Sequence, residues 1–164
     1  MLKSEFYREA RRDHPGPLAG IRVLEATTTW AGPMCGCVLA DLGADVIKVE
    51  HPEGEVARRS PPMLPGSQPP VSFMHATVNR NKRSLSLDLR RPEGKATFLR
   101  LAREADAVVE SFRPGVLDRL GIGWEALRRE NRRLVLCSIS GYGQDGPYAQ
   151  RAGHDLDYCA YAGV

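Results

Sequence analysis

Apolar residues change their spacing along the chain in a way that predicts alternating strands and helices. Residues 21–26 form a short apolar run, which is typical of a buried strand. Apolar residues over 35–42 then recur at spacings of three and four, which predicts a helix, and Gly43 is suited to end it. Residues 45–50 predict a second strand. Because these elements follow one another closely, we expect a right-handed parallel crossover.

The alternation continues through the rest of the chain. Leucines alternate with polar residues over 84–89, as in a third strand, and Pro92 is placed to begin the next helix. The remaining expected elements are two strands, 107–110 and 134–139, and short helices within 111–120 and 124–130. Five strands alternating with helices favour an α/β fold with a doubly wound parallel sheet and flanking helices.

Two segments lie outside this alternation. Residues 1–17 are charged and end in Pro-Gly-Pro, so we expect an arm that is not part of the core. The segment 52–70 is rich in proline, which predicts a long irregular loop of the kind that often forms a lid or a ligand wall. An apolar patch at 71–78 follows this loop.

The C-terminal end of the sequence has an unusual composition. Asp155 is placed to cap a helix that has barely begun when the chain reaches Val164. The termini of a complete domain usually lie at its surface, whereas this end is apolar. We therefore expect residues 18–164 to be an incomplete domain of a truncated chain.

Composition and charge argue against several classes of protein. The chain is 42% hydrophobic and 26% charged with a formal net charge of +3, ordinary values that do not favour a nucleic-acid partner. No stretch reaches the roughly 18 apolar residues of a membrane helix, so we expect no membrane association. Four irregularly spaced cysteines favour the cytoplasm. Cys35-Gly-Cys37 lacks the spacing of common zinc motifs, so no metal is expected.

Basic side chains supply candidate contacts for an anion. Lys82 and Arg83 stand next to the third expected strand, where side chains and backbone together could hold a phosphate. Arg90 and Arg91 are interpreted instead as solvated surface.

The opening strand–helix–strand unit also raises the possibility of dinucleotide binding. Glu50 ends the second strand, where the acidic partner of a ribose would lie. The segment 27–33 lacks the Gly-x-Gly-x-x-Gly fingerprint, and Pro33 removes an amide that would hold pyrophosphate. A nicotinamide enzyme is therefore disfavoured, although a nucleotide site at these strand ends is not.

A histidine and a carboxylate meet near the C-terminal end. A glycine-rich turn at 140–147 leads to Gly153-His154-Asp155. A histidine just before a helix feels the positive end of the helix dipole, which favours the neutral imidazole that can accept a proton. A structural role for His154, with Asp155 only as a helix cap, is an equal alternative on these residues alone.

A set of segments in fixed order resembles class III CoA transferases and their relatives, the α-methylacyl-CoA racemases. The segments are Pro17–Glu25, Ala31–Pro33, Leu39–Glu50, Asn81–Ser84, Glu110–Gly115, Gly141–Pro147 and Gly153–Asp155. The ordered set is specific, and the likeness extends from 17 to 164. It implies a Rossmann-like domain that binds the CoA part of a thioester, in enzymes that form interlocked homodimers.

The resemblance also implies individual contacts at the matching positions. His51 would contact the adenosine end of CoA, and Lys82, with Arg83 beside it, the phosphates. The residues that would line the CoA groove are Phe112, Arg113 and Arg119.

Two reactions are compatible with the resemblance. In a racemase-like reaction His154, oriented by Asp155, would remove the α-proton of an acyl-CoA, and a second group would return a proton to the opposite face. In a transferase an aspartate attacks the thioester, and CoA passes to an acceptor carboxylic acid. Residues 153–155 lean towards proton transfer.

Both reactions need an aspartate that the family carries beyond Val164, so we expect this chain alone to be inactive. The alternative is a non-catalytic CoA-binding module or a truncated gene fragment.

Overall fold

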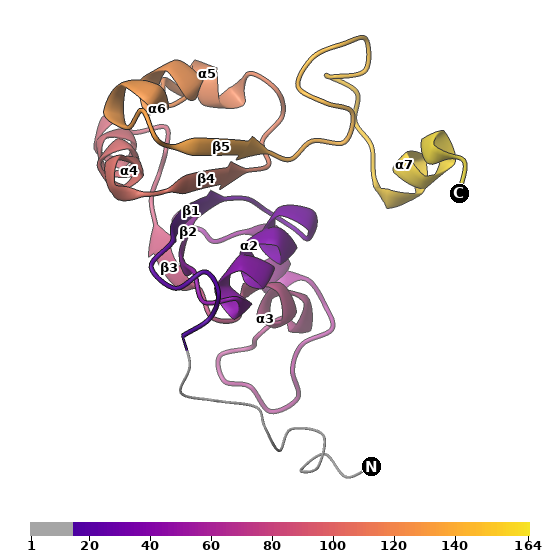
Figure 1. Cartoon of the computed structure of the whole chain (residues 1–164). Coiled ribbons are helices and arrows are strands. Elements are labelled where there is room, and N and C mark those ends of the chain that lie inside the picture. The colour runs from indigo at the N-terminus through magenta and orange to yellow at the C-terminus, as the bar shows by residue number, and fades with distance from the viewer. Residues whose placement is uncertain (1–14) are drawn as a thin grey trace.

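Five parallel strands form one sheet in the order β3-β2-β1-β4-β5 (Figure 1). The computed structural model describes residues 15–164, so the expected arm at 1–17 falls almost wholly outside the described residues. The strands are β1 (Arg22–Ala26), β2 (Asp45–Glu50), β3 (Arg83–Ser86), β4 (Ala107–Glu110) and β5 (Val135–Ser138). The predicted α/β fold with a parallel sheet and flanking helices is therefore confirmed.

Helices cover both faces of this sheet (Figure 1). On one face lie α2 (Ala31–Asp41) and α3 (Phe73–Asn79), and on the other lie α4 (Pro92–Glu104), α5 (Val116–Leu120) and α6 (Trp124–Glu130). A 3₁₀ turn, η1 (Val56–Arg59), lies in the proline-rich loop, and α7 (Asp155–Ala162) stands apart from the sheet. Helices on both faces explain why the central strands β1 and β4 are buried on both sides, with polar residues such as Glu25 and Glu110 included.

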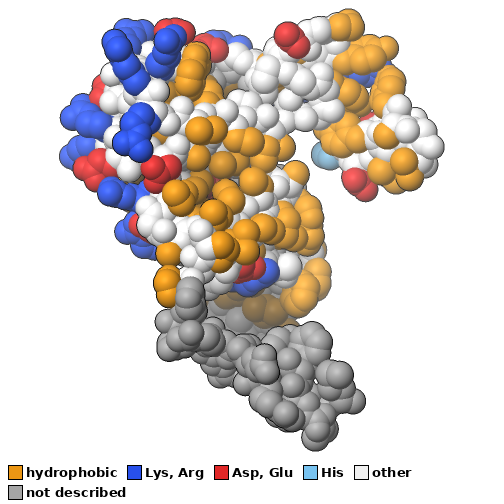
Figure 2. Space-filling view, viewed as in Figure 1, with side chains coloured by type: hydrophobic (Ala, Val, Ile, Leu, Met, Phe, Trp, Pro, Cys, Tyr) orange, Lys and Arg blue, Asp and Glu red, His pale blue; other side chains and the backbone are white. Residues whose placement is uncertain are grey.

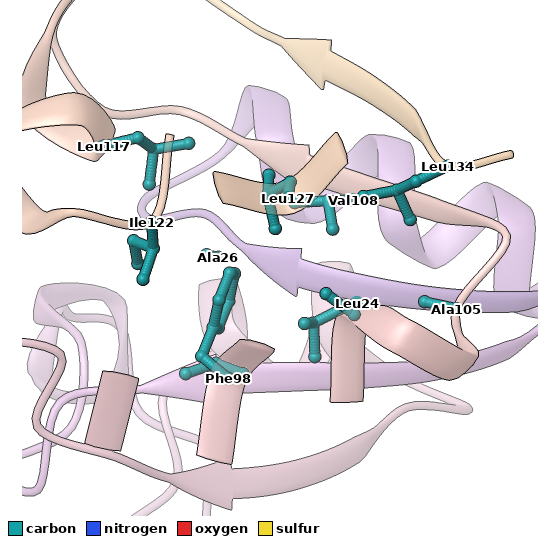
Figure 3. Close-up of a cluster of buried hydrophobic side chains, with 11 residues drawn as sticks. Leu24, Ala26, Phe98, Ala105, Val108, Leu117, Ile122, Leu127 and Leu134 are labelled. Atoms are coloured by element: carbon teal, nitrogen blue, oxygen red, sulfur yellow. The ribbon is translucent and has the colours of Figure 1, made fainter. Parts of the chain in front are cut away.

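The larger part of the core lies between the sheet and α4, α5 and α6 (Figure 3). Phe98 of α4 is fully buried and packs with Leu24 of β1 and Val108 of β4. Leu127 of α6 and Ile122, which precedes α6, belong to the same cluster and have no exposed surface. A smaller cluster lies under α2 on the opposite face.

The helix α2 lies unusually close to the sheet because two of its residues have no side chain. A Cβ on Gly36 would lie 1.8 Å from Oε2 of Glu25, and a Cβ on Gly32 would lie 2.4 Å from Cβ of Thr27. Glycines four residues apart share one helix face, and this face lies against the end of β1. The sequence pattern predicted the helix from its apolar residues but not this glycine contact.

Several predicted boundaries differ from the structure. The expected strand at 84–89 ends at Ser86, although Leu87 still donates its amide to the Glu50 carbonyl, 2.8 Å away. The apolar patch at 71–78 contains α3, which begins after Ser72, whose hydroxyl accepts the His75 amide. The residue that precedes α7 as its N-cap is His154, so the prediction that Asp155 caps this helix is wrong.

The proline-rich loop is anchored to the sheet by Glu50, at the end of β2. Its two carboxylate oxygens lie 2.6 Å from Nε and 2.7 Å from Nη2 of Arg58, and the Ser84 hydroxyl donates to it at 3.1 Å. Burial alone would raise the pKa of Glu50, but the hydrogen bonds and charge of Arg58 outweigh burial and hold this pKa below its usual value of 4.5.

We expect Phe98→Ala to lower the free energy of unfolding by about 3 kcal/mol, because it removes a fully buried ring and leaves a cavity. Urea unfolding followed by circular dichroism measures this change. Arg100→Ala, on the exposed side of the same helix, is the control and should change it by less than about 0.5 kcal/mol. Equal losses in the two variants would contradict the assigned core.

The Glu50–Arg58 pair predicts a stability difference that depends on pH. Because the folded-state pKa of Glu50 lies below 4.5, the pair's contribution is present above that pH and is lost as pH falls through the folded value. Arg58→Ala should cost about 2 kcal/mol at pH 7, discounted for the partial exposure of Arg58. The difference from the unmodified chain should shrink at pH 3, whereas Arg59→Ala should show no such dependence. Urea unfolding at both pH values tests this.

Candidate functional site

The chain reverses its direction across the sheet between β1 and β4. After β1 it runs outward through β2 to β3, then returns to the other side of β1 to form β4 and β5. Open α/β sheets bind ligands in the crevice beyond the carboxyl ends of the strands at such a reversal. Residues 27–30 follow β1 and residues 111–115 follow β4, so these two loops form the walls of the candidate site.

The two loops contact each other directly. The amide of Thr28, after β1, donates to Oγ of Ser111, after β4, at 3.1 Å. Thr28 and Trp30 are exposed, with Trp30 at 46%. An exposed indole at this edge offers an apolar surface on which a planar or aliphatic part of a ligand could rest.

Three of the predicted groove residues come together at the carboxyl end of β4. Phe112 donates its amide to Oε2 of the buried Glu110 at 2.7 Å and packs against the main core. Arg113 lines a cavity of about 160 Å³ with Trp124 of α6. A Cβ on Gly115 would lie 3.2 Å from Nη1 of Arg119, so this guanidinium lies over the same turn. The β4–α5 segment therefore presents an aromatic ring and two exposed cations at one edge.

His51 lies at the carboxyl end of β2, on the same edge of the sheet. Its Nε2 is 2.6 Å from Nη2 of Arg90, whose Nε lies 3.0 Å from Oδ1 of Asp88. The hydrogen bonds from Arg90 lower the pKa of Asp88 to about 2. Sequence interpretation assigned Arg90 to solvated surface and missed this contact. The parallel pairing of β2 with β3 was the available signal, because it brings the residues after both strands to one edge.

Lys82 and Arg83 do not lie at this edge. Lys82 directly precedes β3 and Arg83 is its first residue, so both lie at the amino end of the strand. Arg83 forms an ion pair with Asp45 at the start of β2, 2.5 Å from Nη2 to Oδ2. The Lys82 side chain is 2% exposed, and its Nζ lies 2.7 Å from Oε2 of Glu25. Burial lowers the pKa of Lys82 despite this partner. The geometry thus gives no support to a phosphate contact by either residue.

His154 and Asp155 lie at the start of α7. The His154 amide donates to Oδ2 of Asp157 at 2.8 Å, and the Tyr158 hydroxyl donates to the Gly153 carbonyl at 2.7 Å. Both predicted catalytic residues are exposed, and within residues 15–164 no hydrogen bond joins Asp155 to the His154 ring. The carboxylate that contacts His154 is therefore that of Asp157, through the backbone.

The glycine-rich segment connects α7 to the candidate site. Gln150 donates from Nε2 to the Pro114 carbonyl, 3.3 Å away, in the turn that carries the groove residues. Three tyrosines, Tyr148, Tyr158 and Tyr161, pack edge to face against Tyr142, and Tyr148 and Tyr161 also contact each other at a tilt. The four rings form a small aromatic cluster. This cluster, rather than the sheet, fixes the start of α7.

The charges on the surface are unevenly distributed (Figure 2). Lys and Arg side chains gather over α4 and α6, while hydrophobic side chains gather over α2.

Within residues 15–164 no group of three His, Cys, Asp or Glu side chains could hold a metal ion. Over the same residues, no helix has the length and apolar character needed to cross a membrane.

Known proteins match this chain over nearly its whole length. The family model described as CoA-transferase family III matches residues 18–164. A probable fatty acyl-CoA transferase, Rv3272, of Mycobacterium tuberculosis is 47% identical over 90% of the chain, and a succinate–glutarate CoA-transferase of Agrobacterium fabrum is 49% identical over 85%. Human α-methylacyl-CoA racemase is 42% identical over 90% of the chain.

The fold agrees with these sequence matches. A CAIB/BAIF family protein from Brucella suis superposes with a TM-score of 0.87 at 43% identity, over 92% of this chain and 40% of that protein. The chain spans 37% of the length of Rv3272, 36% of the Agrobacterium enzyme and 34% of the human racemase. By its match from residue 18 to residue 164, and by a fold shared with solved relatives, the chain belongs to CoA-transferase family III.

Proposed function

We propose that this region binds the CoA part of an acyl-CoA thioester at the carboxyl ends of β1, β2 and β4. The observation that carries the proposal is the convergence of Phe112, Arg113 and Arg119 on one turn beside the reversal in strand order. CoA has an adenine ring, phosphates and an aliphatic arm, and this edge offers an aromatic ring, exposed cations and an exposed indole to match them.

The ribose phosphate of CoA has a natural position beside His51. In sheets of this topology the end of the second strand faces the ribose, and a nearby arginine accommodates a phosphate on it. Arg90 is held at this place by Asp88 and lies against the His51 ring. Arg90 thus takes the role for which Lys82 was considered from sequence.

For the reaction of the intact protein we propose α-proton transfer on an acyl-CoA. His154 directly precedes α7, and its exposure leaves the imidazole ring accessible to a substrate. The second proton-transfer group, the partner copy and any acceptor acid belong to the intact enzyme. CoA transfer between carboxylic acids is the alternative, because two of the relatives described above carry names of CoA transferases.

We expect Arg90→Ala to weaken binding of CoA about tenfold, because one charge-assisted hydrogen bond to the ribose phosphate is lost. Binding of dephospho-CoA, which lacks this phosphate, should be unchanged. Isothermal titration of both ligands makes the comparison. Arg91→Ala, an exposed neighbour on the same turn, is the matched control. Equal losses of affinity for CoA and dephospho-CoA would show that Arg90 does not recognise the ribose phosphate.

In the intact parent enzyme, His154→Ala should lower exchange of the substrate α-proton with solvent deuterium at least 100-fold, because it removes the proposed base. Proton NMR of the acyl-CoA in D₂O follows this exchange. Asp155→Asn should retain most of the exchange, since Asp155 makes no hydrogen bond to the His154 ring within the described residues. Unchanged exchange in His154→Ala would favour CoA transfer.

The chain 1–164 alone should bind CoA and catalyse neither reaction.

A further inference from the structure

Four charged side chains are buried together between α2, α3 and the sheet. They are Glu25, Lys48, Glu55 and Lys82, each with at most 2% of its side chain exposed. Lys48 Nζ lies 3.0 Å from Oε1 of Glu25 and 3.7 Å from Oε1 of Glu55, and Lys82 Nζ lies 2.7 Å from Oε2 of Glu25. Two positive and two negative charges leave this buried charge cluster neutral.

Stability alone does not explain such a cluster. Each ion loses several kcal/mol of hydration on burial, and well-packed apolar side chains in its place are often as stable or more so. In some proteins a buried ionic group specifies one conformation of the chain around it. The contacts of the cluster with the backbone identify that conformation.

Three members of the cluster each hold one backbone atom of the segment from Thr27 to Pro33, which comprises the β1–α2 loop and the first turn of α2. Lys48 Nζ donates to the Thr27 carbonyl at 3.0 Å, and Lys82 Nζ donates to the Pro33 carbonyl at 2.7 Å. Oε2 of Glu55 accepts the Thr29 amide at 3.0 Å. The loop that forms one wall of the candidate site is therefore held at Thr27 and Thr29, and the first turn of α2 is held at Pro33.

Thr29 adopts a backbone conformation that is unfavourable for its side chain. Its φ is +70°, in the left-handed region, where β-branched residues are genuine outliers. Such strain costs of order 1–3 kcal/mol, persists only where the surroundings over-determine it, and is concentrated at functional sites. Glu55 makes the hydrogen bond to the strained residue itself.

The Glu55 carboxylate is in turn held by α3. Its Oε1 lies 3.0 Å from Nδ1 of His75 and 3.3 Å from Nδ2 of Asn79, while Oε2 remains for the Thr29 amide. Glu55 belongs to the proline-rich loop after β2, so one side chain connects three segments that are distant in sequence. A carboxylate fixed on both oxygens can hold a strained amide in one position.

We propose that Glu55 is a positioning residue that keeps residues 28–30 in the strained conformation required for binding the thioester ligand. This inference rests on the proposed CoA site, which it deepens. With Thr29 held at positive φ, Trp30 stays exposed at the crevice and Thr28 stays bonded to Ser111. A loop ordered before the ligand arrives does not lose conformational freedom on binding, and affinity is higher for that reason.

The test compares Glu55→Ala with Glu53→Ala, an exposed glutamate of the same loop, in the intact parent enzyme. Amide hydrogen exchange of residues 28–32 without ligand and CoA affinity by calorimetry are the readouts, beside urea unfolding. Glu55→Ala should speed this exchange and weaken CoA binding, each about tenfold, and Glu53→Ala should change neither. Glu55→Gln keeps an oxygen for the Thr29 amide and should retain most of the affinity.

A rescue variant separates positioning from a merely structural role. Glycine adopts positive φ without strain, so Thr29→Gly should recover part of the CoA affinity lost in Glu55→Ala, although it adds no contact. If Glu55→Ala does not fold, His75→Leu removes one of the two contacts that α3 makes with Oε1 of Glu55 and should shift both readouts in the same direction by a smaller factor.

Unchanged exchange at 28–32 in these variants would overturn the inference, as would faster exchange with unaltered CoA affinity. Absence of CoA binding by the unmodified enzyme would instead overturn the proposed function. The exchange measurement would then still decide whether Glu55 holds the loop.

Discussion

The structure depends on the central position of β1, which pairs in parallel with β2 on one side and β4 on the other. Parallel pairing brings the carboxyl ends of all five strands to one edge, so the loops after β1, β2 and β4 converge without further constraint. The right-handed crossover rule then requires helices to change faces when the chain reverses its direction across the sheet. This explains why α2 and α3 lie opposite α4 and α6.

Charge in this molecule has two different environments. At the carboxyl edge, Arg113 and Arg119 are exposed and can exchange water for an anionic ligand. Beneath the β1–α2 loop, Lys48 and Lys82 are paired with carboxylates and withdrawn from solvent. A lysine of the second kind shapes the site through the backbone and does not need to contact the ligand. The position of a cation relative to the sheet therefore decides whether it is exposed to a ligand or buried with a carboxylate.

The order and type of most elements could be predicted from apolar spacing, because the strands and helices of an α/β domain with helices on both faces of its sheet have strong periods. The helix α3 was missed because it is short and mixes polar and apolar residues directly after a proline-rich loop. Lys82 was interpreted as a phosphate contact, because its partner Glu25 is distant in sequence and no pattern reveals the pair. Arg90 was set aside for the same reason, since only strand pairing brings it to His51.

The predicted groove residues Phe112, Arg113 and Arg119 were proposed through a family resemblance, not through spacing. The structure shows why spacing could not find them: their proximity depends on the turn at Gly115, which has a φ of +79°. Likewise, no sequence pattern could show that the strained residue in the opposite loop is Thr29. Contacts formed by loops follow tertiary structure, which periodicity does not encode.

The close contact between α2 and β1 has a consequence for how this domain can vary. Because a methyl group at Gly36 would occupy the space of the Glu25 carboxylate, the two positions cannot change independently. An alanine at 36 is compatible only with a shorter side chain at 25, and that change would leave Lys48 and Lys82 without their shared counterion. In a double-mutant cycle these positions should therefore be strongly non-additive. Glycine usually destabilises a helix, but here Gly36 couples the packing of α2 to the buried charge cluster, so that a change in one requires a change in the other.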